Sequence, residues 1–301
     1  MGDSLKFRFA GFVISYERPK IILDTLQQIF NQTLVPEKLY VIDNSESEDV
    51  KVAINQLGDL RIKYYRVGDN IGPAGAASIG LKLLTNEGYQ WIYWGDDDNP
   101  PVFNDSFEIL LGIVEKNSLQ KAGIVGAVGH AFNRVTGNIE RTPDIALSQV
   151  SFLAVDSIAG GHSMIINAEV IRSGILPDEK LFFGFEELDF CLKAKHEGYD
   201  IAVSTELFLR SRKQFNRLNY EHPLYIMKDL STLKRQYYSI RNLLAILKHN
   251  HLYCAYAYQL LKNLVKMGYG FRYGWKYGLR NFNVLAMGMI HSIMGTMNKV
   301  Y

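Results

Sequence analysis

The sequence is poor in cysteine and has no long apolar run. Its 301 residues include two cysteines, Cys191 and Cys254, which lie far apart and lack the spacing of a metal-binding pair. The nearest candidate for a membrane span, Val284 to Ile290, ends at His291, well short of the roughly 18 to 20 apolar residues that a bilayer requires. Charged residues interrupt the first ten positions, and no small-residue cleavage site follows them. We therefore expect a globular protein in a reducing, cytoplasmic setting, with neither a spanning helix nor a signal peptide.

Acidic residues are scarce in the last third of the chain. From Leu207 to Tyr301 there are 15 Lys and Arg residues against two acidic ones, Glu221 and Asp229, which gives a net charge of +13. Residues 1–206 carry a net charge of −11, so the overall charge of +2 is the sum of an acidic first part and a basic second part. We expect two parts, 1–206 and 207–301, with different partners. The acidic first part would repel a phosphate backbone, which argues against nucleic-acid binding.

Short apolar segments of the first part alternate with helical ones. This order predicts an α/β fold, a Rossmann-like and mostly parallel sheet flanked by helices, which binds ligands beyond the carboxyl ends of its strands. The expected strands are Phe9–Ser15, Leu39–Ile42, Ile62–Val67, Trp91–Trp94 and Gly123–Val128, and the expected helices are Pro19–Phe30, one that opens after Asp69, and Phe107–Glu115. The polar stretch from His130 to Val155 is expected to form a loop region or a strand pair near the site.

Polar side chains follow these strands where each one ends. Because parallel strands end at one edge of a sheet, we expect Ser15, Asp43, Asn70 and Asp96 to converge on one crevice. A single residue such as Asp43 is more simply a helix cap, but the recurrence at several strands favours the crevice.

Small residues from Gly72 to Ala77 open the helix that follows Asn70. They would let this helix lie close to the sheet, or let a nucleotide and its sugar lie close to the helix, and the sequence does not distinguish the two. The pattern is neither a P-loop nor a dinucleotide fingerprint.

Three consecutive carboxylates, Asp96, Asp97 and Asp98, follow the aromatic run Tyr89–Gly95, in which Gly95 is expected to stop the strand. Adjacent acids repel one another, and a divalent cation bound by oxygen ligands removes that cost. We therefore interpret Asp96 and Asp98 as ligands of Mg²⁺ or Mn²⁺. The alternative is a solvated acidic turn that ends at Asn99-Pro100-Pro101.

A second acidic group opens a later helix. Glu186, Glu187 and Asp189 follow three phenylalanines, and the helix dipole alone would favour acids there. Partial burial beside those rings would also raise the pKa of one carboxylate toward the range of a general base. Before this helix, the pair Gly160-Gly161 would let the backbone approach a ligand, and His162 either contacts an acceptor or completes a turn.

The ordered set of these motifs resembles family 2 glycosyltransferases of the GT-A fold, and within them the bacterial rhamnosyl- and galactofuranosyltransferases. The resemblance covers about residues 9–205. Its segments are Ile14–Arg18, Gln32–Pro36, Val41–Ser45, Asn70–Gly75, Asp96–Asp98, Leu181–Asp189 and Glu197–Tyr199.

The resemblance implies a role for each motif. The turn Ser15-Tyr16-Glu17 and Asp43 would hold the nucleotide of the donor, beside Asn70, Gly72, Asp96 and Asp97. Asp96 and Asp98 would be the Asp-x-Asp metal site, with Asp98 the more direct ligand. Glu187 would be the base, with Glu186 or Asp189 as alternatives, and Gly161 and His162 are candidates for acceptor contact.

Two departures bear on these roles. Glu187 stands where the family commonly has Asp, and the segment Arg210–Lys213 stands where many members have a metal-binding histidine. His222 is an alternative ligand, although a histidine beside Pro223 has an equally simple structural explanation.

The second part, 207–301, is expected to be a helical C-terminal region. Tyr237–Asn242 resembles a motif that is frequent after the catalytic domain of these transferases, and Tyr269–Tyr277 interleaves aromatic and basic residues. Such a composition suits a surface that faces anionic lipid. A bundle that packs on the first part, or one that forms a homo-oligomer, explains it equally well.

Together these features predict an inverting, metal-dependent glycosyltransferase. It would move a sugar from a UDP- or dTDP-sugar to a saccharide acceptor, with a polyprenyl-diphosphate-linked saccharide as one candidate, in bacterial polysaccharide or cell-envelope glycan synthesis. The expected location is the cytoplasm or, peripherally, the inner face of the cell membrane. A nucleotidyltransferase, which would release pyrophosphate, and a non-catalytic sugar-nucleotide-binding or membrane scaffold protein are the alternatives.

Overall fold

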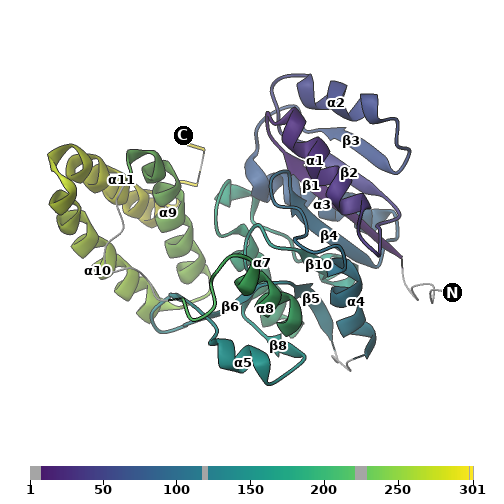
Figure 1. The fold of residues 1–301 in the computed structure, drawn as a ribbon. Helices are drawn as coiled ribbons and strands as arrows, with labels where there is room; N and C mark the ends of the chain where they lie inside the picture. Colours follow the sequence, from purple (N-terminus) through teal and green to yellow (C-terminus); the bar gives the residue numbers. More distant parts are fainter. Residues whose placement is uncertain (1–7, 117–120, 221–228, 298, 301) are drawn as a thin grey trace.

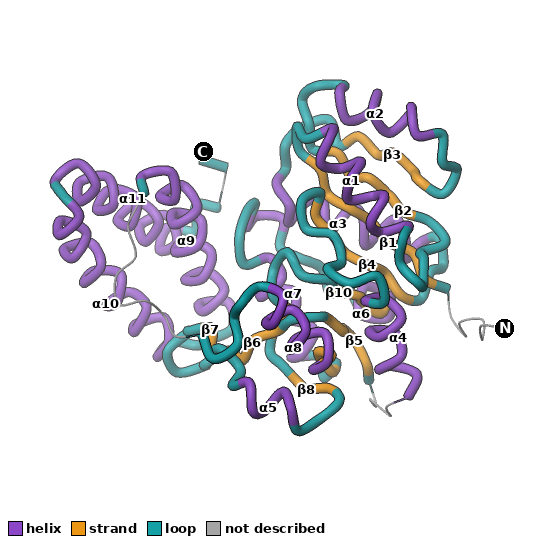
Figure 2. Tube along the Cα trace, viewed as in Figure 1, coloured by secondary structure: helices purple, strands orange, loops and turns teal. Residues whose placement is uncertain are grey.

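The computed structural model describes residues 8–116, 121–220, 229–297 and 299–300. An α/β part holds a large central sheet, and three long helices near the C-terminus lie beside it (Figure 1). The colouring by secondary structure in Figure 2 shows that strands are confined to the α/β part.

The central sheet has eight strands in the order β3-β2-β1-β4-β10-β5-β11-β8. β3, β2, β1 and β4 are parallel, as are β5 and β11, whereas β10 is antiparallel to both β4 and β5, and β8 is antiparallel to β11. The strands are β1 (Phe9–Ser15), β2 (Leu39–Asp43), β3 (Ile62–Arg66), β4 (Trp91–Asp96), β5 (Ala122–Gly126), β8 (Phe152–Ala154), β10 (Met164–Asn167) and β11 (Asp200–Ser204). The predicted mostly parallel sheet is confirmed. β4 continues through Gly95 to Asp96, two residues beyond the expected end at Trp94, so the expectation that Gly95 stops the strand was wrong.

Helices cover both faces of this sheet because alternate residues of its strands are apolar on each side. Phe12 and Trp94 pack on one face with α3 (Gly72–Asn86), α6 (Ala168–Arg172) and α7 (Glu186–His196). Val13 and Tyr93 pack on the other face with α1 (Pro19–Phe30), α2 (Asp49–Leu57) and α4 (Ser106–Lys116).

Small residues let α3 lie directly on the sheet. A Cβ atom built on Gly80 would stand 2.5 Å from the Phe12 ring, and Ala76 and Ala77 are fully buried in the same core. Close packing of helix and sheet therefore accounts for most of the small residues in this helix.

The strand registers bring the ends of several strands together. Ser15 of β1 pairs with Asp43 of β2, and Ile14 pairs with Asp96 of β4. Because β10 is antiparallel, its first residue, Met164, pairs with Trp94, so the loop that precedes β10 reaches the same edge as the ends of β1 and β4.

A smaller antiparallel sheet, β7-β6-β9, lies between the central sheet and the helical part. It consists of β6 (Gly129–Phe132), β7 (Ile139–Glu140) and β9 (Ser157–Ile158), and α5 (Asp144–Ser148) follows it. The predicted strand pair between His130 and Val155 is thus present.

The helical part contains α9 (Leu233–His249), α10 (Tyr253–Tyr269) and α11 (Trp275–Met294), with short 3₁₀ turns at Leu230–Thr232 and Gly270–Tyr273; a further 3₁₀ turn, Glu179–Leu181, precedes α7 in the α/β part. α8 (Thr205–Gln214) packs on the α/β part, against α5, β8 and β11. The boundary expected at residue 206 therefore falls at the start of a helix that belongs to the α/β part. In the described residues no helix combines the length and hydrophobicity of a bilayer span.

Candidate active site

A cleft of about 550 Å³ opens at the carboxyl edge of β1 and β4. Six segments of the α/β part and one residue of α9 meet there. They are Ile14, Ser15, Tyr16 and Arg18; Asn44, Asn70 and Pro73; Asp96–Asn99 with Gly160 and Gly161; Phe182–Gly184 with Glu186 and Glu187; and Arg235.

Asp97 fastens the turn after β1 to the end of β4. Its buried Oδ2 accepts hydrogen bonds from Ser15 Oγ and from the backbone N–H of Tyr16, both at 3.2 Å. Its Oδ1 accepts one from Arg18, and its backbone carbonyl accepts another from Thr25 Oγ1. The middle acid of the triplet thus shapes the cleft wall, because both of its carboxylate oxygens are engaged within the protein.

Asp96 and Asp98 face the cleft in different ways. Burial, with the nearby charges of Glu187, Asp98 and Asp97, raises the pKa of Asp96 to about 7. Asp98 is half exposed and ion-pairs with Arg18 at 2.5 Å, while its other oxygen accepts a hydrogen bond from Asn99. The acids concentrate negative charge at one wall, and Arg18 is the cation that offsets part of it.

Glu186 and Glu187 begin α7 and line the cleft together with the acidic triplet. Burial first, and then the charges of Glu187 and Asp96, raises the pKa of Glu186 well above 4.5. Glu186 Oε2 is buried and has no hydrogen-bond partner among the described residues. Burial also raises the pKa of Glu187. A carboxylate held in this way takes up a proton more readily than an ordinary glutamate.

The glycine pair lies against these groups. A Cβ atom on Gly160 would stand 2.7 Å from Glu187 Oε1, and one on Gly161, where φ is +72°, would stand 3.1 Å from Asn99 Nδ2. The absence of side chains here lets the backbone before β10 approach the side chains of Glu187 and Asn99.

Asp189 lies outside the cleft. Its buried carboxylate pairs with Lys193 at 2.5 Å and accepts the backbone N–H of Asp178, which fixes the loop that leads to α7. We do not retain it as a candidate base.

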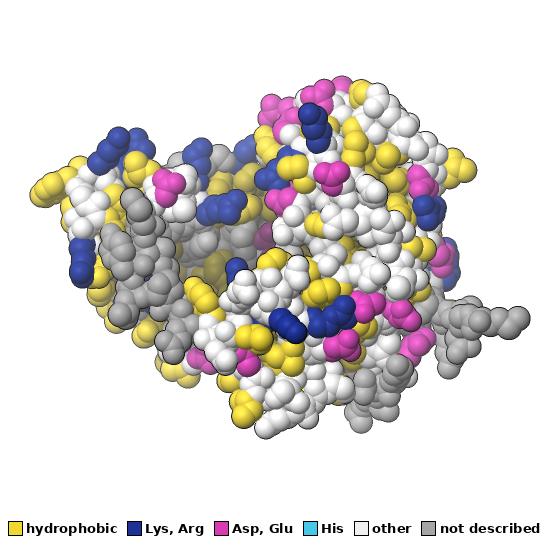
Figure 3. All heavy atoms as spheres, in the orientation of Figure 1, with side chains coloured by type: hydrophobic (Ala, Val, Ile, Leu, Met, Phe, Trp, Pro, Cys, Tyr) yellow, Lys and Arg dark blue, Asp and Glu magenta, His cyan; other side chains and the backbone are white. Residues whose placement is uncertain are grey.

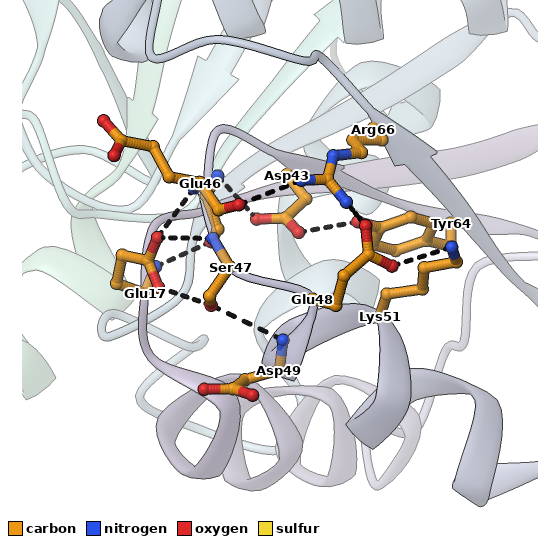
Figure 4. A network of polar contacts seen from close by, with 10 residues as sticks. Glu17, Asp43, Glu46, Ser47, Glu48, Asp49, Lys51, Tyr64 and Arg66 are labelled. Atoms are coloured by element: carbon orange, nitrogen blue, oxygen red, sulfur yellow. Dashed lines mark hydrogen bonds and ion pairs between the residues drawn. The ribbon is translucent and has the colours of Figure 1, made fainter.

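Glu17 and Asp43 are not among the residues that line the cleft. Both carboxylates accept hydrogen bonds from neighbouring residues of the α/β part (Figure 4). Glu17 accepts the backbone N–H groups of Glu46 and Ser47 and the hydroxyl of Ser47, and these bonds lower its pKa. Asp43 is fully buried and accepts hydrogen bonds from Tyr64 at 2.8 Å and from the backbone of Ser45 at 2.9 Å. Both carboxylates hold loops in place, and neither caps α2, which starts at Asp49.

Asn70 and Asn44 occupy the side of the cleft next to α3. Asn70 lines it and accepts the backbone N–H of Gly72, whose own φ of +76° places it against the Phe182 carbonyl. Asn44 Nδ2 donates to the Gly72 carbonyl at 3.1 Å, and its buried Oδ1 has no partner among the described residues.

His162 faces a separate, small enclosed space that it shares with Asp96, Gly161 and Glu187. Burial, and then the charge of His130, lowers its pKa to about 4, so it is neutral at physiological pH. It lies behind the glycine pair, not in the main cleft.

Three cleft residues were not singled out from the sequence. Arg18 belongs to the segment Ile14–Arg18, but nothing in the sequence indicates that its side chain reaches Asp97 and Asp98. Asn99 was read as part of a turn. Arg235 comes from α9, beyond the expected catalytic part, and only the packing of the two parts shows that it lines the cleft.

No group of three or more Asp, Glu, His or Cys side chains in the described residues is arranged to hold a metal ion by itself. Arg210 and Arg212, at the position of the family's histidine, ion-pair with Asp105 and Asp144 instead. His222 lies outside the described residues. A metal here would therefore rest on the Asp-x-Asp oxygens together with oxygens of a bound substrate.

Comparison with known proteins gives consistent results. Residues 12–157 match the family model described as Glycosyl transferase family 2. The chain is similar to galactofuranosyltransferase GlfT1 of Mycobacterium tuberculosis, with 25% identity over 188 residues that cover 59% of this chain and 61% of that protein. It is 22% identical to GlfT1 of Mycolicibacterium smegmatis over 199 residues, 62% of this chain and 65% of that protein. The chain thus matches less than two thirds of the length of these curated relatives.

Two solved structures share the fold. The mannosyltransferase PcManGT from Pyrobaculum calidifontis, in complex with GDP-Man and Mn²⁺, matches with a TM-score of 0.55 and 12% identity over 97% of this chain and 89% of that one. GalNAc-T7 with UDP, GalNAc and Mn²⁺ matches with a TM-score of 0.58 and 13% identity over 98% of this chain and 59% of that one. At these identities the likeness establishes the fold, and the predicted GT-A class is confirmed.

Proposed function

We propose that this chain, which carries a family 2 glycosyl transferase domain over residues 12–157, moves a sugar from a nucleoside diphosphate donor to a hydroxyl of a saccharide acceptor with inversion. The observation that carries the proposal is one cleft that Asp96 and Asp98 line together with the acidic pair Glu186 and Glu187 at the start of α7. A donor site and a base that share one cavity are what a direct displacement needs.

The residues of the cleft divide the work. Ser15 and Tyr16, fixed by Asp97, form the wall for the nucleotide, and Arg18 and Arg235 supply positive charge for a diphosphate. Glu187 accepts the proton of the acceptor hydroxyl as that oxygen attacks the face of the sugar opposite the leaving diphosphate. Its raised pKa suits this role, because a more basic carboxylate takes up the proton of the acceptor hydroxyl more readily.

The oxygen atoms of Asp96 and Asp98 fit Mn²⁺ or Mg²⁺. Burial first, and then the charges of Glu187, Asp98 and Asp97, raises the pKa of Asp96, and a divalent cation bound there would favour its ionised form. When bound, such an ion stabilises the charge that develops on the leaving diphosphate. Arg18 already holds Asp98 in an orientation toward the cleft.

We favour a uridine or thymidine donor because the curated relatives that the chain resembles are galactofuranosyltransferases. For the acceptor, we favour a growing bacterial envelope glycan, in line with the mycobacterial origin of these relatives.

A panel of nucleotide sugars with Mn²⁺ or Mg²⁺ tests the activity. We expect slow release of a nucleoside diphosphate from one UDP- or dTDP-sugar, accelerated by saccharide acceptors. Release of pyrophosphate would establish the nucleotidyltransferase alternative. Nucleotide binding without any turnover across the panel would support the non-catalytic alternative.

We also propose that the helical part binds the surface of an anionic membrane. Large apolar side chains on α10 and α11 are exposed at helical spacing, among them Val265 at 71% and Trp275 at 76%. The full set is Tyr253, Tyr258, Leu261, Leu264, Val265, Tyr269, Trp275, Leu279, Phe282, Ile290, Ile293 and Met294, which we call the apolar face. Exposed Arg272, Lys276 and Arg280 lie among them. Figure 3 shows hydrophobic and basic side chains together on the helical part, while most acidic ones lie on the α/β part.

Lipid is the occupant that fits both features. Apolar side chains sit at headgroup depth, and each base close to an anionic surface contributes about 1 kcal/mol. The net charge of +13 from Leu207 onward matches such a surface, whereas a second copy of this face would repel it.

Flotation with vesicles tests this proposal. We expect binding to phosphatidylglycerol-containing vesicles that weakens in high salt, and little binding to pure phosphatidylcholine. The double variant Leu261→Ser/Val265→Ser should reduce binding, and Leu60→Ser, at an exposed site of the α/β part, should not. Equal binding to both vesicles, or none, would refute the proposal, and a dimer in sedimentation would then assign the apolar face to a second copy.

A further inference from the structure

The loop that leads into α7 adopts an unusual backbone. Phe182, Gly184 and Phe185 have φ values of 62°, 84° and 69°. Two of these three residues carry side chains that disfavour this left-handed region, so the conformation persists only where its surroundings hold it. The strain ends one residue before Glu186, and the loop therefore sets the direction in which Glu186 and Glu187 leave the backbone.

Asn242 of α9 holds this loop from the helical part. Its Nδ2 donates to the carbonyls of Leu181 and Phe183 at 2.9 Å and of Gly184 at 2.8 Å. Arg241 donates from one guanidinium nitrogen to the Leu181 carbonyl at 2.9 Å and from Nε to Asn242 Oδ1 at 3.0 Å. The last bond orients the amide, because it turns Oδ1 toward Arg241 and the N–H groups toward the loop.

Both side chains are fully buried, at 0% exposure. An apolar residue at position 242 would remove the side-chain donor from the carbonyls of Phe183 and Gly184, whereas the Leu181 carbonyl would keep the bond from Arg241. The loop is also packed by aromatic contacts, since the Phe182 and Phe183 rings lie 5.5 and 6.1 Å from the ring of Tyr238. We call Arg241 and Asn242 the clamp. The clamp holds the backbone of the loop, and Tyr238 packs against the side chains of Phe182 and Phe183.

The clamp is more than an attachment of the two parts, because a second attachment exists elsewhere. Gln259 of α10 donates to the Thr136 carbonyl at 2.7 Å and to Asn138 Oδ1 at 3.0 Å, at the turn between β6 and β7. That contact holds the helical part to the α/β part without touching the loop that leads into α7.

We infer that Arg241 and Asn242 are positioning residues for Glu187: they hold the loop in the conformation that aims the carboxylate into the cleft. This inference rests on the proposed function, in which Glu187 is the base. The helical part then contributes to the reaction through backbone geometry, in addition to the Arg235 side chain at the cleft.

Asn242→Asp tests the clamp, because it keeps the shape of the side chain but removes both N–H donors. We expect kcat to fall about 10- to 100-fold, since a misplacement of about 1 Å has an effect of that order. The Kd of the nucleoside diphosphate, measured by calorimetry, should change less than twofold. Gln259→Met is the matched control, because it removes buried hydrogen bonds between the same two parts; it should lower Tm comparably and leave kcat within twofold.

Hydrogen exchange provides a readout that does not need activity. Backbone amides of residues 182–187 should exchange faster in Asn242→Asp than in Gln259→Met at equal distance below each Tm. If Asn242→Asp does not fold, Asn242→Ser, which retains one donor, should show a smaller change of the same kind.

The outcomes separate the two proposals. Equal exchange in the two variants, or equal kcat at equal Tm, would overturn the clamp. If the amides of residues 182–187 exchange faster in Asn242→Asp but the wild type transfers no sugar, the clamp holds the loop and the proposed function is wrong.

Discussion

Replacement of Gly160 by alanine should displace Glu187 without disturbing the fold. A Cβ at this position would stand 2.7 Å from Glu187 Oε1, 3.2 Å from its Cδ and 3.4 Å from Oε2. Ordinary contact begins at 3.4 Å, so the nearer oxygen must move by about 0.7 Å. Gly160 is not among the residues with positive φ, and alanine can therefore adopt its backbone conformation.

The size of the effect follows from that shift. A misplacement of about 1 Å at a reacting group costs about 10²-fold, so we expect kcat to fall about 10- to 100-fold. The displaced group is the end of a flexible side chain, which keeps the change in stability small. The Kd of the nucleoside diphosphate should stay within twofold, because the new Cβ would meet Glu187 and none of the residues that we assign to the nucleotide.

The assay is the initial rate of nucleoside diphosphate release at saturating donor and acceptor, with Tm recorded for each protein. Gly112→Ala in α4 is the control, since a Cβ there meets no atom within 4 Å. It should leave kcat unchanged and stabilise the helix by up to about 1 kcal/mol. If Gly160→Ala retains the wild-type kcat, the observed position of Glu187 is not the one from which it acts.

Other substitutions in the cleft have distinct expectations. Asp98→Ala should abolish transfer and the stimulation of nucleotide binding by Mn²⁺ while Tm is preserved; full activity of this variant, or of the wild type in EDTA, contradicts the metal assignment. Glu187→Gln should reduce kcat about 10²- to 10⁴-fold with the nucleotide Kd nearly unchanged. If Glu186→Gln inactivates the enzyme and Glu187→Gln does not, the base is Glu186. Because the folded pKa of Glu186 is raised, its ionisation opposes folding as pH rises above 4.5. Glu186→Gln should therefore stabilise the protein by about 1 to 3 kcal/mol, more at pH 8 than at pH 5, as calorimetry at both values would show.

Much of the fold was predictable because its signals are local. The strands β1, β2 and β4 are short apolar runs that end in polar residues, and their registers bring Ser15, Asp43 and Asp96 to one edge as expected. The resemblance to family 2 glycosyltransferases, inferred from the order of the motifs, is confirmed by the match over residues 12–157.

The direction of β10 was not predictable in the same way. Met164–Asn167 is a four-residue apolar run, and nothing in such a run tells whether it pairs parallel or antiparallel. Its place between β4 and β5 depends on which edges the rest of the sheet leaves unpaired. The proximity of Gly160 to Glu187 follows from that direction, so it could not be derived from the glycine pair alone.

The roles within each acidic group also depend on tertiary contacts. Asp96, Asp97 and Asp98 are identical in chemistry, and the backbone N–H of Tyr16 and the hydroxyl of Ser15 single out Asp97 for the interior. Asp43 lies at the predicted edge but turns toward Tyr64, away from the cleft. In the same way, the Tyr237–Asn242 motif was recognisable, but the loop that it holds was not.

The place of β10 has a consequence for the order in which the protein assembles. β3, β2, β1 and β4 form one half of the sheet, and β5, β11 and β8 form the other; β10 is the strand that hydrogen-bonds to both. The acidic triplet belongs to the first half, whereas α7 leads into β11 of the second. Pairings between segments so distant in sequence form slowly, because loop closure precedes the gain from contacts. We expect Asp96 and Glu187 to meet only after β10 joins the two halves of the sheet, so that catalytic competence arises late in folding. A substitution that weakens the pairing of β10 should therefore delay the appearance of activity more than the formation of secondary structure.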